Sequence, residues 1–201
     1  MMTKLSISEK FNHLVKVISS ERFLTNKLLF KEVPCFIADY DIKEQAEFIR
    51  LQEQLINNLE NKNIKILNIN LYDLVISILK DTGDWDWYIE HESEMQKDEF
   101  LEALHGLLDI ETVIVPEISK KMQNSEFDVM FITGVGEVFP YIRSHTILTN
   151  LHKFIKDKPT LMFFPGEYKY SENRGSNFSL FNKFPEDREY RATNIFEIKE
   201  V

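Results

Sequence analysis

The chain has 201 residues, 43% of them hydrophobic, which is enough to build one sizeable core. Its net charge of −9 argues against sequence-independent binding to nucleic acid, because such binding needs a basic face that displaces counterions. No apolar run is long enough to cross a bilayer, and a single cysteine, Cys35, rules out an internal disulfide. Since the amino terminus lacks a signal-peptide pattern, we expect a cytoplasmic protein.

The amino-terminal half alternates amphipathic helices with short apolar strands. Ser6 to Glu9 has the form of a capping box, and apolar residues recur after it at helical spacing. Asn70 stands where it can cap a later helix by accepting hydrogen bonds from that helix's first amides. The predicted elements are helices over residues 7–20, 21–30, 44–61 and 71–80, with strands over 33–38 and 64–69.

The middle of the chain is helical and contains both tryptophans. Gly83 ends the preceding helix, and Trp85 and Trp87 then flank an aspartate. The two tryptophans either anchor a partner or fix a loop to the core. Residues 91–124 read as two helices separated near Asp109, which either pack on the sheet or project as a small lobe.

The stretch from Phe127 to Gly166 has the pattern of a βαβ unit. Apolar strands are predicted over 127–133 and 160–164, with a glycine loop over 134–139 and a helix over 140–151 between them. Such a unit packs right-handed onto a parallel sheet. The loop after its first strand lies where α/β folds place their sites.

The final segment, residues 167–201, is rich in polar residues and is expected to be mostly loop, mobile over 169–177, with an edge strand over 190–196. We therefore predict one α/β domain over residues 1–201, with a helical insertion at about 90–124. Its architecture is expected to be three-layered, with a mostly parallel sheet of about four strands. It would resemble a nucleotide-binding fold that has lost its phosphate loop.

Gly134 and Gly136 follow a strand and precede a helix, which is the context of phosphate capture by backbone amides. The dinucleotide fingerprint fails, because Phe139 stands where glycine or alanine is required. The nucleotide P-loop also fails, since no glycine in the chain is followed by lysine. The alternative is that the two glycines allow a tight turn, and we expect no cofactor.

Acidic residues follow several of the predicted strands. Carboxylates that meet at one end of a sheet can hold magnesium for phosphoester chemistry. The alternative is a set of separate surface carboxylates and helix caps. The four residues concerned are Asp39, Asp41, Glu137 and Glu167.

Known catalytic motifs are incomplete in this chain. His91 begins a pattern like that of a zinc-protease helix, but Met95 stands where the second histidine is needed. No Gly-x-Ser-x-Gly elbow is present. We therefore assign no catalytic residue.

An ordered set of motifs resembles the BrxB family, the small component of BREX bacteriophage-resistance systems. The motifs are Glu137–Ser144, Pro159, Phe163–Tyr168, Ser179–Phe181 and Tyr190–Ala192, together with the early strand Pro34–Asp41. The resemblance covers most of the chain. It implies a cytoplasmic accessory protein without an established catalytic activity, and it carries over no catalytic residue.

The resemblance also implies partners. A PglZ protein of the alkaline-phosphatase type is the expected direct contact, and a large ATPase and an adenine DNA methyltransferase are the other BREX components. No membrane partner is expected, nor direct DNA contact by the chain alone. The hypothesised binding face comprises Trp85, Trp87, Arg143, Tyr168, Phe178 and Phe181.

Overall fold

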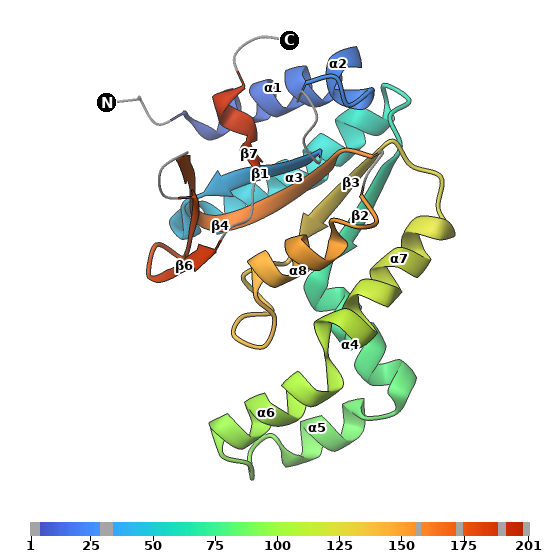
Figure 1. Cartoon of the computed structure of the whole chain (residues 1–201), viewed down its shortest axis with the longest axis vertical. Helices are drawn as coiled ribbons and strands as arrows, with labels where there is room; N and C mark the ends of the chain where they lie inside the picture. The colour runs from blue at the N-terminus through green and yellow to red at the C-terminus, as the bar shows by residue number, and fades with distance from the viewer. Residues whose placement is uncertain (1–4, 29–33, 156–157, 172–174, 189–191, 199–201) are drawn as a thin grey trace.

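A parallel sheet with helices on both faces forms the body of the protein (Figure 1). The computed structural model describes residues 5–28, 34–155, 158–171, 175–188 and 192–198. The strands follow the order β2–β3–β4–β1–β7, and each neighbouring pair along this path is parallel. Their bounds are β1 Cys35–Tyr40, β2 Ile66–Asn70, β3 Val129–Thr133, β4 Thr160–Ser171 and β7 Thr193–Asn194. The predicted three-layer α/β class with a mostly parallel sheet is confirmed.

Alternate strand residues build two separate hydrophobic cores. On β1, Phe36 lies in the core beneath α1 and α3, whereas Ile37 lies in the core beneath α4, α7 and α8. Because both faces are covered, the five residues of β3 are all buried. The helices are α1 Ile7–Ile18, α2 Glu21–Leu24, α3 Gln45–Glu60, α4 Leu71–Thr82, α7 Val115–Gln123 and α8 Ser144–Leu151.

Local capping signals set several helix boundaries as predicted. Ser6 and Glu9 form the expected capping box at the start of α1. The Asn70 side chain accepts from the amides of Tyr72, at 2.9 Å, and Asp73, at 3.2 Å. Gly83 ends α4 in the left-handed conformation, which glycine adopts without a steric penalty.

The sequence left open whether the helices after Gly83 pack on the sheet or project as a small lobe, and the structure shows both. Helices α5 (Trp85–His91) and α6 (Lys97–Leu107) project from the end of α4, away from the sheet (Figure 1). We call residues 83–107 the helical lobe. The chain then returns through the π-helical turn η2 (Ile110–Ile114) and through α7, which buries Ile118 in the main core. A single domain with an insertion at 90–124 stays a prediction.

The segment after Gly166 differs from the expected loop. The second half of β4 pairs antiparallel with β5 (Gly175–Leu180), and β5 pairs with β6 (Phe184–Arg188). We call this the antiparallel extension. The sequence does not indicate these strands, because most of their residues are polar or charged. Among the residues of β5 whose burial is described, Phe178 and Leu180 are buried.

Two further boundaries differ from the prediction. Helix α8 begins at Ser144 rather than at residue 140, because turns with buried Val138 and Ile142 occupy the residues before it. The predicted edge strand over 190–196 is β7, only two residues long, followed by the 3-10 turn η3 (Ile195–Glu197). Residues 190 and 191 of the predicted strand, and 172–174 of the predicted mobile loop, lie outside the described residues.

Removing the side-chain cap of α4 should weaken the fold. We expect Asn70→Ala to lower the free energy of unfolding by about 1 kcal/mol, because two amides lose their acceptor. Urea titration measures this value. The control, Asn57→Ala at an exposed position of α3, should change it by less than about 0.5 kcal/mol. Equal effects of the two substitutions would contradict the assigned cap.

Candidate functional site

Asp39 lies at the carboxyl end of β1 and binds two distant segments. Its Oδ2 accepts a hydrogen bond from the Tyr168 amide at 3.1 Å, and its Oδ1 accepts from Asn194 Nδ2 at 3.0 Å. One carboxylate therefore connects β1 to the antiparallel extension and to β7. Burial raises the pKa of Asp39, although the two hydrogen bonds and the charge of Lys10 act in the opposite direction.

Lys10 lies beside this carboxylate and is itself only 5% exposed. Its Nζ is 3.2 Å from a carboxylate oxygen of Glu44. The same Nζ lies 5.0 Å from the ring centre of Phe48 and 5.7 Å from that of Phe196, so two aromatic faces help to hold the buried charge. Lys10 is thus held by α3 and by the carboxy-terminal segment.

A polar cleft of about 480 Å³ opens beside these groups. Its volume is within the range of small-molecule sites. Its charged groups are mixed in sign, with one lysine among several carboxylates, so the cleft offers hydrogen bonds but no strong field of one sign. The polar residues that line it include Lys10, Asp39, Asp41, Glu167, Asn182 and Asn194.

The four carboxylates of the magnesium hypothesis do not assemble into a metal site. Asp39 is bonded inward, Asp41 caps the 3-10 turn after β1 through the Lys43 amide at 3.1 Å, and Glu167 pairs with Lys169 at 2.7 Å. Glu137 is exposed. Across the described ranges, no three His, Cys, Asp or Glu side chains are grouped as metal ligands would be. Asp39, Asp41 and Glu167 line the same cleft, but each already has a hydrogen-bond or ion-pair partner within the chain, and Glu137 lies outside that lining.

The glycine loop is closely packed by other parts of the chain. Gly134 has φ of +71°, and a Cβ there would lie 2.4 Å from Asn70 Oδ1. A Cβ on Gly136 would lie 2.8 Å from the Phe181 ring and 2.9 Å from Pro165 Cγ. The cavity between this loop and Tyr40 holds only about 100 Å³, well below the volume of a ligand pocket. Packing therefore accounts for both glycines without a phosphate.

Tyr40 closes the wall opposite the glycine loop. Its hydroxyl donates a hydrogen bond to Gln45 Oε1 at 2.9 Å, and its ring stacks on Phe48 with centres 4.2 Å apart. Burial raises the pKa of the Tyr40 hydroxyl, and the negative charge of Glu137 raises it further. The hydroxyl therefore stays protonated and acts as a hydrogen-bond donor.

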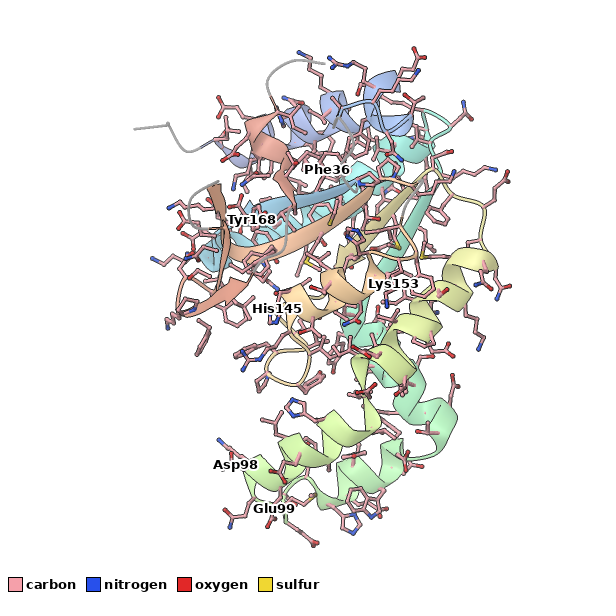
Figure 2. All side chains as sticks on the ribbon, in the orientation of Figure 1. Phe36, Asp98, Glu99, His145, Lys153 and Tyr168 are labelled. Carbon is pink, nitrogen blue, oxygen red and sulfur yellow. The ribbon has the colours of Figure 1, made fainter. Side chains whose placement is uncertain are left out.

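Two residues of the hypothesised binding face are in the core instead. Tyr168 is 2% exposed and Phe178 is fully buried, and their rings lie 4.7 Å apart (Figure 2 labels Tyr168). They are register partners on β4 and β5, so both side chains point to the same, inward face. The Tyr168 hydroxyl also donates to the carbonyl of Ala192 at 2.8 Å. Neither residue is placed to contact a partner in this structure.

An aromatic cluster is exposed at the outer edge of the extension. We use that term for Phe139, Phe181 and Phe184. The Phe184 ring lies 4.9 Å from that of Phe139 and is 44% exposed, whereas Phe181 is half-buried over Gly136. Phe139 and Phe184 were not predicted as site residues, because nothing local in the sequence indicates the hairpin that joins them. Arg143, also exposed, precedes α8.

The two tryptophans of the helical lobe have different environments. Trp85 is partly buried against the main core, and Lys80 Nζ lies 5.4 Å from its ring centre. Trp87 is 46% exposed and stacks on His91 with ring centres 4.6 Å apart. One tryptophan therefore anchors the lobe internally, while the other presents its ring to solvent.

Comparison with known sequences identifies the family. The sequence model of the family described as BREX protein BrxB matches residues 67–195 of this chain. The chain belongs to the BrxB family. The matched range contains the glycine loop, the antiparallel extension and both lobe tryptophans, whereas Lys10, Asp39 and Asp41 of the cleft lie outside it. The BrxB family is a component of BREX systems.

Two curated BrxB relatives span nearly the whole chain. A BREX protein BrxB of Bacillus cereus (strain H3081.97) is 33% identical over 198 residues, which are 95% of this chain and 98% of the relative. A BREX protein BrxB of Escherichia coli O9:H4 (strain HS) is 27% identical over 178 residues, or 89% and 86% of the two chains. No solved structure matches this BrxB-family chain. No helix among its described residues has the length and apolar character of a membrane span.

Substituting Asp39 should change how stability depends on pH. Because the pKa of Asp39 is raised, the native state holds this proton more tightly than the unfolded chain does. The stabilisation that this proton gives to the native state is complete below the ordinary aspartate pKa of about 4. It is lost as pH rises through the raised pKa of the native state. The free energy of unfolding of the wild type, minus that of Asp39→Asn, should therefore fall as pH rises above about 4 in urea titrations.

Asp81→Asn, at an exposed position, controls for the loss of one charge in this experiment. A wild-type minus Asp39→Asn difference that stays flat, or that grows as pH rises, would contradict the burial assigned to Asp39.

Two glycine substitutions test whether packing explains the glycine loop. Gly136→Ala should destabilise the fold by about 1–3 kcal/mol, because the new methyl group meets Phe181 and Pro165. A Cβ on Gly106, in α6, would meet open space, so Gly106→Ala should instead stabilise the fold by about 0.5–1 kcal/mol. Thermal or urea unfolding measures both values. A Gly136→Ala variant as stable as the wild type would contradict the described packing.

Proposed function

We propose that this chain is a non-catalytic accessory subunit of a BREX phage-defence assembly in the cytoplasm. Its direct partner is a PglZ-type protein, and the large ATPase and the adenine DNA methyltransferase are further members of the assembly. The family assignment supports the BREX context. The partner, the compartment and the absence of catalysis are the proposal.

The observation that carries this proposal is that the chain itself covers the glycine loop and part of the sheet's carboxyl edge. Open α/β sheets bind ligands outside the carboxyl ends of their strands. Here the antiparallel extension lies at that position, held to β1 through Asp39, and Phe181 covers Gly136, while the cleft of about 480 Å³ stays open beside Asp39. We infer that such a fold serves as a scaffold whose surface binds other proteins.

Exposed aromatic residues provide the surface for association. Interfaces are rich in Trp, Phe and Arg, and a few buried aromatic anchors supply most of their binding energy. Among the residues first proposed, Trp87 and Arg143 are exposed and Phe181 is partly so. Trp87 lies on the helical lobe, Phe181 belongs to the aromatic cluster, and Arg143 precedes α8. Within one α/β domain, the lobe would be an inserted element used for binding.

Co-purification tests the proposed association. The full chain carrying an affinity tag is expressed with the complete BREX gene set, and we expect the PglZ-type protein to be recovered with it in a fixed ratio. Recovery of this chain alone, under conditions in which the other BREX components remain associated, would contradict the proposal.

A pair of carboxylate substitutions separates this proposal from a magnesium-dependent phosphoesterase. Glu137→Gln with Glu167→Gln removes two exposed carboxylates at the strand ends. A non-catalytic subunit should keep both co-purification and phage resistance at the wild-type level. Loss of resistance with an unchanged melting temperature and unchanged co-purification would favour catalysis.

A further inference from the structure

The negative charge of the chain is concentrated in the helical lobe. Residues 83–107 contain eight acidic residues and one basic residue, a net charge of −7 out of −9 for the whole chain. All of the acidic residues except Asp84 are exposed. Among the residues that the structure describes, none of the eight takes part in an ion pair. This charge is therefore not neutralised within the described fold.

The internal packing of the lobe turns its acidic side chains outward. Tyr88 and Phe100 meet edge to face with ring centres 5.5 Å apart, and Leu104 is 7% exposed. Asp98 and Glu99 lie at the far end of the lobe (Figure 2). The acids do not form a metal site, since no group of three potential ligands occurs in the described part of the chain.

Two apolar side chains are exposed on α5 among these acidic residues. Trp87 is 46% and Ile89 is 56% exposed, and they flank the buried Tyr88 on opposite sides of the helix, because residues two positions apart do not share a face. Exposing a tryptophan and an isoleucine to water is unfavourable, by about 25 cal/mol for each Å² of apolar surface. Association that covers these two side chains would recover that free energy. Aromatic anchors surrounded by polar residues are the usual composition of a binding hot spot.

We propose that the helical lobe docks onto a basic protein surface, a face rich in lysine and arginine with an apolar socket for Trp87. This inference rests on the proposed function and names the chemistry of the partner's face. Opposite charge would guide the encounter and fix the orientation, while burial of Trp87 and Ile89 would provide affinity.

Charge excludes the other classes of occupant. Nucleic acid and anionic lipid would be repelled by the lobe, because their surfaces carry the same sign of charge. A second copy of this chain is also a poor match, since the residues outside the lobe have a net charge of −2. A protein with a basic face is the occupant that the charge distribution fits.

Photocrosslinking tests this docking in cells that express the full chain and the complete BREX gene set. A photoreactive phenylalanine analogue replaces Ile89 in the lobe or, in a parallel strain, Phe184 in the aromatic cluster. We expect position 89 to form an adduct with one BREX component, mapped by mass spectrometry to a segment rich in lysine and arginine. An adduct on an acidic or neutral segment would overturn the inference.

The two positions distinguish the failure of this inference from that of the proposed function. Adducts with BREX components from position 184 alone would overturn the docking of the lobe and leave the accessory role standing. No adduct from either position would overturn both.

Charge reversal, with a matched control, tests the proposed electrostatic attraction between the lobe and its partner. Glu90→Lys with Glu102→Lys, both in the lobe, should reduce recovery of the crosslinked component by about tenfold or more and should reduce its sensitivity to salt. Glu53→Lys with Glu60→Lys makes the same charge change on exposed positions of α3 and should have little effect. Melting temperatures establish that both variants fold. Equal recovery with the two pairs would overturn the inference.

Discussion

The Asp39 carboxylate is the contact on which the arrangement of this fold most depends. It accepts hydrogen bonds from residues 129 and 155 positions later in the chain, and it thereby joins β1 to the antiparallel extension and to β7. Its raised pKa indicates that the cost of removing the carboxylate from water exceeds the help of its partners. Such a group adds little net stability, and its role here is to fix one arrangement of the segments around it.

Other polar contacts reinforce the same closure. His13 Nε2 lies 2.8 Å from the carbonyl of Ile195, and the Tyr168 hydroxyl binds the backbone of Ala192. Because β7 has only two residues, these side-chain contacts, rather than a long ladder, hold the carboxy-terminal segment. The edge at which related architectures bind ligands is therefore partly covered by the chain, and the cleft beside Asp39 stays open. The exposed aromatic residues lie elsewhere, on the helical lobe and at the outer edge of the extension.

The sequence predicted those features whose causes are local. The Ser6 capping box, the Asn70 cap and the Gly83 terminus depend on residues within one turn, and the structure has them at the predicted positions. The apolar runs of β3 and β4 likewise indicated strands covered on both faces. The parallel sheet followed from the βαβ pattern, whereas the order of the strands was not predicted.

The remaining features depend on contacts between distant residues. Phe178 is buried and Phe184 is exposed because of the way the β5–β6 hairpin packs. Most residues of this hairpin are polar, so composition alone predicted a loop. The partners of Asp39 could not be predicted from its sequence neighbours, because they lie on segments far along the chain. The acidic charge of the lobe is visible in the sequence, but its exposure required the arrangement of α5 and α6.

Hydrogen exchange at the Tyr168 amide tests the closure of the carboxyl edge most directly, because this amide donates to the Asp39 carboxylate. In the free chain it should exchange as slowly as the amides of β1. Exchange of Tyr168 at the rate of an open loop, while the β1 amides remain protected, would show that the edge is open and would contradict the account.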